Sequence, residues 1–237
     1  MTPDQETGLR RFKDVLQKAD LFELKFGEES YPWLSEICFH FSEMGGISRE
    51  QTTGIVAVLS PMIMWRTNLE AAKLLIQSKG EICRGPGFRK NYEKALKILN
   101  ENDLSVISGP KVLPFYKVLL DHACQEIVVD THMLAAFNGV RSYTVDARRW
   151  EGSQIKQVAD LVRIISEEKG WLLSRTQATI WITWKRITKG RGDQLSLWGS
   201  DGNKKLPNMW KGILSQIEKG KGQEEFRQID MLHKTVL

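Results

Sequence analysis

Residues 106–133 read VISGPKVLPFYKVLLDHACQEIVVDTHM and carry most of the information about the fold. A Gly109-Pro110 turn opens an amphipathic helix, a short polar linker follows, and Asp130 stands directly after three apolar residues. The first turn of a helix has backbone N–H groups without intrahelical partners, and such groups bind phosphate well. An aspartate just beyond this turn is positioned to act on a sugar of the same nucleic-acid strand.

The remainder of the chain also has helical spacing. Apolar residues recur at intervals of three and four, and serine–glutamine pairs form capping boxes ahead of two of these runs. The expected helices are 52–59 after Ser48 and Gln51, 68–77, 90–100, 156–168 after Ser153, and a helix to about Thr188 after Ser174 and Gln177. No segment alternates as a strand does and no repeat is visible, so the chain is predicted to be all-α.

Composition favours a protein with reduced cysteines and no membrane segment that can bind a polyanion. The 34 basic side chains exceed the 29 acidic ones and give a net charge of +5, a mild bias that is compatible with a polyanionic partner. Cys38, Cys83 and Cys124 are odd in number and set among apolar neighbours, as reduced thiols are. No apolar run is long enough to cross a membrane and the N-terminus has no signal-peptide pattern, so we expect a soluble, cytoplasmic protein without membrane contact.

The chain is expected to fold as one domain over residues 1–237. Two segments, 138–152 and 190–207, mix turn residues with basic side chains and are interpreted as loops, either plain or in contact with nucleic acid. After Pro207 an amphipathic pattern returns, so the tail is kept with the same domain.

The hairpin and the Val-Val-Asp-Thr-His-Met element resemble the helix-hairpin-helix (HhH-GPD) superfamily of DNA base-excision glycosylases, over roughly residues 48–137. This resemblance implies a two-lobed helical fold. Residues 48–137 would form the glycosylase-like core, and residues 138–237 would join the N-terminal helices in the second lobe. The Leu-Ser-Pro string at 59–61 and the helix after Gln177 also look similar to phage-encoded proteins with the same frame.

The hairpin of the family commonly reads Leu-Pro-Gly-Val-Gly and binds DNA phosphate through backbone amides. Here residues 107–111 read Ile-Ser-Gly-Pro-Lys, so the first glycine is kept and Lys111 replaces the second. The resemblance implies a DNA backbone contact through Gly109, Pro110 and Lys111. The alternative is a plain turn between helices with Pro110 at the first helical position.

Asp130 matches the catalytic aspartate of the family, and His132 matches the histidine of its Val-Asp-x-His pattern, which we interpret as structural or as a hydrogen-bond partner. The alternative for Asp130 is a simple helix cap. Bifunctional family members carry a nucleophilic lysine four residues after the first hairpin glycine, where this chain has Leu113. The resemblance therefore implies a monofunctional enzyme that uses water and has no strand-nicking lyase activity.

Two further segments are candidates for the pocket of a flipped base. Trp65 and Asn68 share a helical face, and Gln177 and Trp181 share another, although core packing is an alternative for such aromatic residues. The expected pocket residues are Met62, Trp65, Asn68, Gln177, Trp181 and His132, and Lys185 and Arg186 are expected to contact phosphate. Met62 stands where the family usually has glutamine.

Three functional hypotheses follow. The first is a DNA base N-glycosylase that binds double-stranded DNA as a monomer, flips one nucleotide and uses Asp130 with no metal and no cofactor. No cysteine follows Cys124, which excludes the four-cysteine iron–sulfur motif of some family members. The second is a phage-type transferase that hypermodifies DNA bases, and the third is a non-catalytic DNA-binding module.

Overall fold

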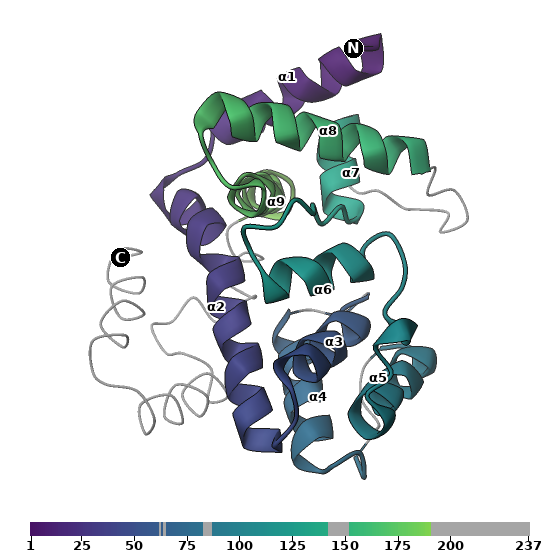
Figure 1. The fold of residues 1–237 in the computed structure, drawn as a ribbon. Helices are drawn as coiled ribbons and strands as arrows, with labels where there is room; N and C mark the ends of the chain where they lie inside the picture. The colour runs from purple at the N-terminus through teal and green to yellow at the C-terminus, as the bar shows by residue number, and fades with distance from the viewer. Residues whose placement is uncertain (62, 64, 83–86, 142–151, 191–237) are drawn as a thin grey trace.

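The computed structural model describes residues 1–61, 63, 65–82, 87–141 and 152–190, and in these residues every regular element is a helix. The prediction of an all-α fold is confirmed for this part of the chain (Figure 1). The elements are α1 Pro3–Gln17, α2 Leu21–Gly45, α3 Arg49–Leu59, α4 Trp65–Gln77, α5 Arg89–Glu101, the short 3-10 helix η1 Leu104–Val106, α6 Val112–Leu120, α7 Thr131–Asn138, α8 Gly152–Lys169 and α9 Leu173–Lys189.

Local capping explains where the first three helices begin. In each, the side chain of the residue before the helix accepts a hydrogen bond from the backbone N–H three residues later, and the side chain of that later residue accepts one from the backbone N–H of the cap residue. The three reciprocal pairs are Thr2 with Gln5, Asp20 with Glu23 and Ser48 with Gln51. The capping box predicted at Ser48 is therefore confirmed.

The other two predicted serine caps are wrong. Helix α9 begins at Leu173 with Leu172 as the N-cap, so Ser174 lies inside the helix. Its hydroxyl donates to the backbone oxygen of His122 at 2.7 Å, which ties α9 to the linker before Asp130. Helix α8 begins at Gly152, which places Ser153 within its first turn. In α9 a tertiary contact uses the hydroxyl that the local pattern assigned to capping.

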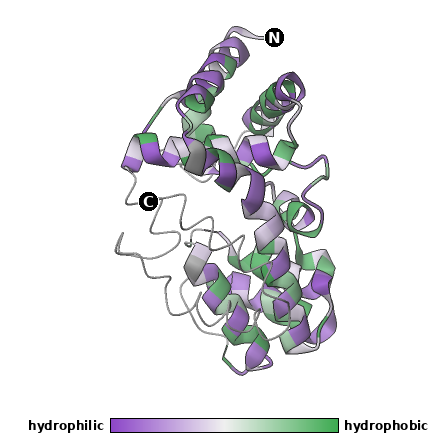
Figure 2. Cartoon of the chain, turned by 90° about the vertical axis from the view of Figure 1, so that its left-hand side faces the viewer, coloured by the Kyte–Doolittle hydropathy of each residue, from purple (hydrophilic) through white to green (hydrophobic). Residues whose placement is uncertain are grey.

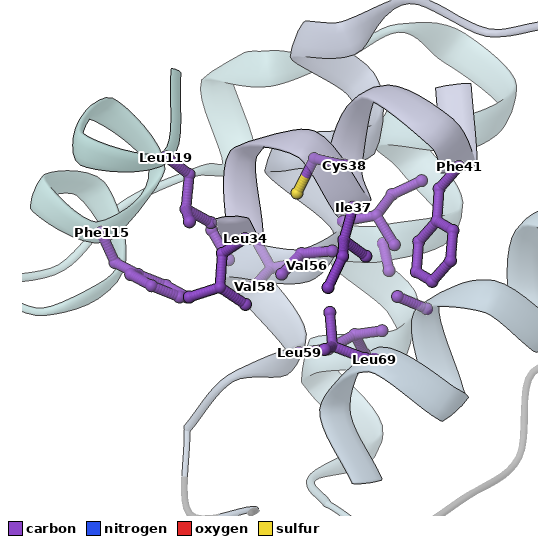
Figure 3. Close-up of a cluster of buried hydrophobic side chains, with 14 of the residues drawn as sticks. Leu34, Ile37, Cys38, Phe41, Val56, Val58, Leu59, Leu69, Phe115 and Leu119 are labelled. Carbon is purple, nitrogen blue, oxygen red and sulfur yellow. The ribbon is translucent and has the colours of Figure 1, made fainter. Parts of the chain in front are cut away.

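Buried apolar side chains gather in two clusters. The first cluster lies among α2–α6 and includes Ile37, Phe41, Leu59 and Leu119 (Figure 3). The second lies among α1, α7, α8 and α9, which occupy the upper part of Figure 1. The partly buried rings of Phe26 and Trp65 pack against both clusters. The border between the clusters therefore has aromatic side chains from α2 and α4.

The clusters divide the chain differently from the sequence boundary expected at residue 137. Helix α7 packs with α1, α8 and α9, whereas α2 packs along α3 and α6 as well as α9. The hairpin before α6 packs with the first cluster through Ile107, whereas the segment before α7 contributes Val128 to the first cluster and Ile127 and Val129 to the second. Most helices carry both polar and apolar residues, as amphipathic helices do (Figure 2). Among the described helices none is long and apolar enough to span a membrane.

Candidate active site

Asp130 is the N-cap of α7 and also has a partner on a distant helix. Its Oδ1 accepts from the backbone N–H groups of His132 at 2.9 Å and Met133 at 3.0 Å. Its Oδ2 accepts from the indole Nε1 of Trp181 in α9 at 2.8 Å. The capping alternative is thus correct for one oxygen, but it does not account for the other. The preceding residues 127–129 are buried, and they hold the half-buried carboxylate at the edge of the second cluster.

Trp181 is fixed by aromatic and cationic neighbours. Its ring stacks on Phe26 of α2 with centroids 6.2 Å apart, and the His132 ring meets it edge-on at 6.0 Å. The ammonium of Lys185 lies 4.8 Å from the indole centroid. Trp181 was predicted as a pocket residue, and because it is only 9% exposed it also packs in the core. His132 lies beside the site, as expected of a structural or hydrogen-bonding neighbour.

Lys111 lies close enough to Asp130 for the charges of the two side chains to interact. Its Nζ donates to the backbone oxygen of Ser60, just after α3, at 3.3 Å. Burial lowers the pKa of Lys111 below the ordinary lysine value, and the nearby Asp130 charge opposes that shift without cancelling it. Leu113, which stands where bifunctional glycosylases carry their nucleophilic lysine, is exposed. Sequence reasoning assigned Lys111 to phosphate, although its spacing of four from the buried Phe115 indicates an inward position.

Tyr31 and Gln177 form a buried polar pair next to these groups. The Tyr31 hydroxyl donates to Gln177 Oε1 at 2.7 Å, and both side chains are buried. Burial raises the pKa of Tyr31 well above its ordinary value, and the negative charge of Asp130 raises it further. Gln177 was predicted as a pocket residue. Tyr31 was not, because nothing in its local pattern distinguishes it from other buried residues of α2.

The predicted pocket residues on α4 have different roles. Trp65 is partly buried and meets Phe115 edge-on at 5.3 Å, between the two clusters. Asn68 is buried, and its Nδ2 donates to the backbone oxygen of Val56 in the last turns of α3 at 3.1 Å. Its Oδ1 has no hydrogen-bond partner among the described residues, and neither does the buried Ser60 Oγ. Met62 lies outside the described residues.

The hairpin is open to solvent. Ser108, Gly109 and Pro110 are exposed, and Gly109 has a φ of +105° with nothing within 4 Å of an added Cβ. Helix α6 begins at Val112, so the alternative that placed Pro110 at the first helical position is wrong. Lys94 of α5 donates to Ser108 Oγ at 3.2 Å, which brings a second cation to this turn.

The two expected phosphate contacts on α9 have protein partners. Lys185 is buried over Trp181, inside the candidate site. Arg186 forms two hydrogen bonds to Glu23, which is fully buried, and a third to the backbone oxygen of Lys18 at 2.6 Å. A phosphate would have to compete with a buried carboxylate for this guanidinium.

The region therefore combines a carboxylate, an amine of lowered pKa, a phenol and an amide from four separate segments. The carboxylate can stabilise a developing positive charge, and the amine can act as a nucleophile when it is neutral. Within the residues that the structure describes, no three His, Cys, Asp or Glu side chains gather as metal ligands do.

The model of a family of unknown function, DUF7178, matches residues 3–188, which include every described helix except the last residue of α9. No curated protein and no solved structure matches the chain.

Proposed function

We propose that this chain, which belongs to the DUF7178 family of unknown function, is a DNA base N-glycosylase. The observation that supports this most strongly is the way Asp130 is held. Three N–H donors, two from α7 and one from Trp181, fix its carboxylate at the border between the clusters. Cleavage of an N-glycosidic bond develops positive charge at C1′, and a preorganised carboxylate stabilises that charge.

The proposed DNA contact is the exposed turn at Gly109. Its open backbone and the adjacent Lys94 suit a phosphate of double-stranded DNA. A nucleotide flipped from the duplex would reach Asp130, and we propose Tyr31, Gln177 and Trp65 as polar and aromatic contacts for its base. We propose that the protein acts as a monomer and that this hydrolysis uses no metal and no cofactor.

The nucleophile has two candidates. In the first, water attacks C1′, the base leaves with the electrons of the glycosidic bond and takes up a proton, and no strand is cut. The position of Lys111 favours a second candidate, in which its neutral amine attacks C1′ as the base leaves. The amine would then lose both of its protons, one to the departing base and one to O4′ as the C1′–O4′ bond breaks, which leaves an imine that borohydride reduces to a stable amine.

One experiment tests the function and separates these candidates. Oligonucleotides carrying uracil, oxidised, alkylated or hydroxymethylated bases are incubated with wild type, Asp130→Asn and Lys111→Met. Mass spectrometry measures the free bases, and borohydride measures covalent trapping. Base release that requires Asp130 supports the glycosylase, and trapping that requires Lys111 identifies the amine as nucleophile. Added mass on DNA bases without abasic sites would instead indicate a hypermodifying transferase, and salt-sensitive binding without any product would indicate a binding module.

A further inference from the structure

We propose that Trp181 is a positioning residue, whose indole N–H fixes the plane of the Asp130 carboxylate for reaction. This role rests on the proposed glycosylase function. The evidence is the 2.8 Å hydrogen bond from Trp181 Nε1 to Asp130 Oδ2, which joins α9 to the first turn of α7 across 51 residues of sequence.

The cap alone does not orient the carboxylate. The two backbone donors of α7 both bind Oδ1, and rotation about the Cβ–Cγ bond of an aspartate is broad and weakly restrained. A donor from a different helix to the second oxygen removes this freedom. Since each carboxylate oxygen can accept more than one hydrogen bond, Oδ2 keeps acceptor capacity for a water or for the charge at C1′.

The donor is itself held in place. Phe26 stacks on the indole from α2 and His132 meets it edge-on, so its position depends on the packing of α2, α7 and α9. The ammonium of Lys185 at 4.8 Å from the ring centroid draws electron density from the indole, which makes the N–H a stronger donor. Lys185 therefore lies against the ring that donates to Asp130, inside the candidate site.

The alternative is that Trp181 only fills space between the clusters, and a double-mutant cycle separates the two roles. Trp181→Phe keeps an aromatic ring but removes the N–H. At saturating enzyme we expect the single-turnover rate of base release to fall about 10- to 100-fold, the range for a lost hydrogen bond to a charged group, with unchanged DNA affinity. In the Asp130→Ala background, which lacks the acceptor, the same change should lower the free energy of unfolding by less than it does in wild type, because the two residues act as one unit.

Trp184 supplies the matched control. It lies three residues further along α9 and packs against the same cluster, but its buried Nε1 has no hydrogen-bond partner among the described residues. Trp184→Phe thus removes an indole N–H without removing a hydrogen bond, and we expect the rate of base release to stay within about twofold of wild type.

A measurement on the folded protein tests the hydrogen bond without relying on turnover. In ¹⁵N-labelled protein, Asp130→Asn should shift the indole N–H signal that disappears in Trp181→Phe, and should leave the other tryptophan signals in place.

An unshifted Trp181 signal would overturn the proposal. So would a wild-type rate in Trp181→Phe, an equal loss of unfolding free energy with Asp130 and in the Asp130→Ala background, or a rate loss in Trp184→Phe equal to that in Trp181→Phe. If wild type releases no base from any substrate, the glycosylase itself fails and the role of Trp181 fails with it. Release by wild type with an unaffected Trp181→Phe would overturn only the role of Trp181.

Discussion

At the scale of single residues, Asp130 has a structural and a proposed chemical role that different substitutions separate. Asparagine keeps an N-cap acceptor and can still accept from Trp181, whereas alanine does neither. We expect Asp130→Ala to lower the free energy of unfolding by about 2 kcal/mol, through the lost cap and the unpaired indole N–H. Asp130→Asn should cost less than about 0.5 kcal/mol, because the two residues are similar caps.

Chemical denaturation of both variants measures this difference. Base release should be lost in both, since neither has a charged carboxylate. Equal stability of the two variants would contradict the cap and the Trp181 contact, and base release by Asp130→Asn would contradict the role of the charge.

The lowered pKa of Lys111 gives a prediction about pH. The unfolded chain, with an ordinary lysine, binds more protons than the folded chain between the folded and unfolded pKa values, so stability should rise with pH across that window. Lys111→Met should remove the rise. If the amine is the nucleophile, borohydride trapping should also increase with pH and level off below 10.5, the ordinary lysine value.

Lys117 is the matched control for Lys111. It lies on the exposed face of the same helix, pairs with Glu126, and has a raised pKa because of that hydrogen bond. Lys117→Met should leave the rise of stability below pH 10.5 unchanged, because the raised pKa of Lys117 puts its own effect on stability above that value. A rise of the same size in Lys111→Met as in wild type would show that Lys111 is not the group responsible.

At the scale of elements, the crossing of α2 and α9 depends on Gly27. A Cβ at this position would overlap Thr179 Oγ1 and lie 2.9 Å from the backbone oxygen of Arg175, and a backbone atom cannot move aside without shifting the helix. We expect Gly27→Ala to destabilise the protein by about 1–3 kcal/mol, in spite of the better helix propensity of alanine. The comparison is Gly54→Ala in α3, whose nearest contact is the flexible end of Ile107 at 2.8 Å.

Thermal or denaturant unfolding of the two alanine variants tests the crossing. Gly54→Ala should be much the milder change, because a side-chain terminus can move by a few tenths of an ångström. Equal effects in the two variants, or a neutral Gly27→Ala, would contradict the close approach of α2 and α9.

Arg186 gives a second prediction at this scale. Removing it takes the cationic partner from the buried Glu23, between the start of α2 and the end of α9, and leaves the hydrogen bond from the backbone N–H of Asp20. Because the guanidinium is partly exposed, we expect Arg186→Met to cost about 3 kcal/mol, the lower end of the range for broken buried pairs. Lys189→Met, one turn further along α9 and exposed, should cost little. Unchanged stability with a smaller salt dependence of DNA binding would instead support the phosphate contact expected from sequence.

The elements also show what sequence predicts and what it does not. The cap at Ser48 and the position of Asp130 at the head of α7 follow from neighbouring residues, so local patterns were enough to predict them. The cap assigned to Ser174 was wrong because a distant carbonyl, that of His122, binds its hydroxyl. Lys111 and Tyr31 reach Asp130 through the packing of α2 and α6, which no spacing within those segments encodes.

At the scale of the whole molecule, the candidate site lies where the two apolar clusters meet, with Phe26 and Trp65 packed against both. DNA bound at the hairpin would bring a flipped base towards this border.

Phosphate contacts release counterions, so we expect affinity for duplex DNA to fall steeply with salt. Lys94→Met, which removes a cation next to the turn at Ser108, should reduce the slope of log affinity against log salt by about 0.9. Lys13→Met is the control, because Lys13 pairs with Glu168 away from the hairpin. An unchanged slope in Lys94→Met would exclude a phosphate contact at this turn.

The central claim is that Asp130 cleaves a glycosidic bond, and the most direct test is mass spectrometry of free bases released from modified DNA. Wild type and Asp130→Asn are compared at equal concentration on the same set of oligonucleotides, after their folding has been verified. The account predicts that wild type releases one class of base and that Asp130→Asn releases none. Release at the same rate by both proteins, or by neither while both bind DNA, would contradict it.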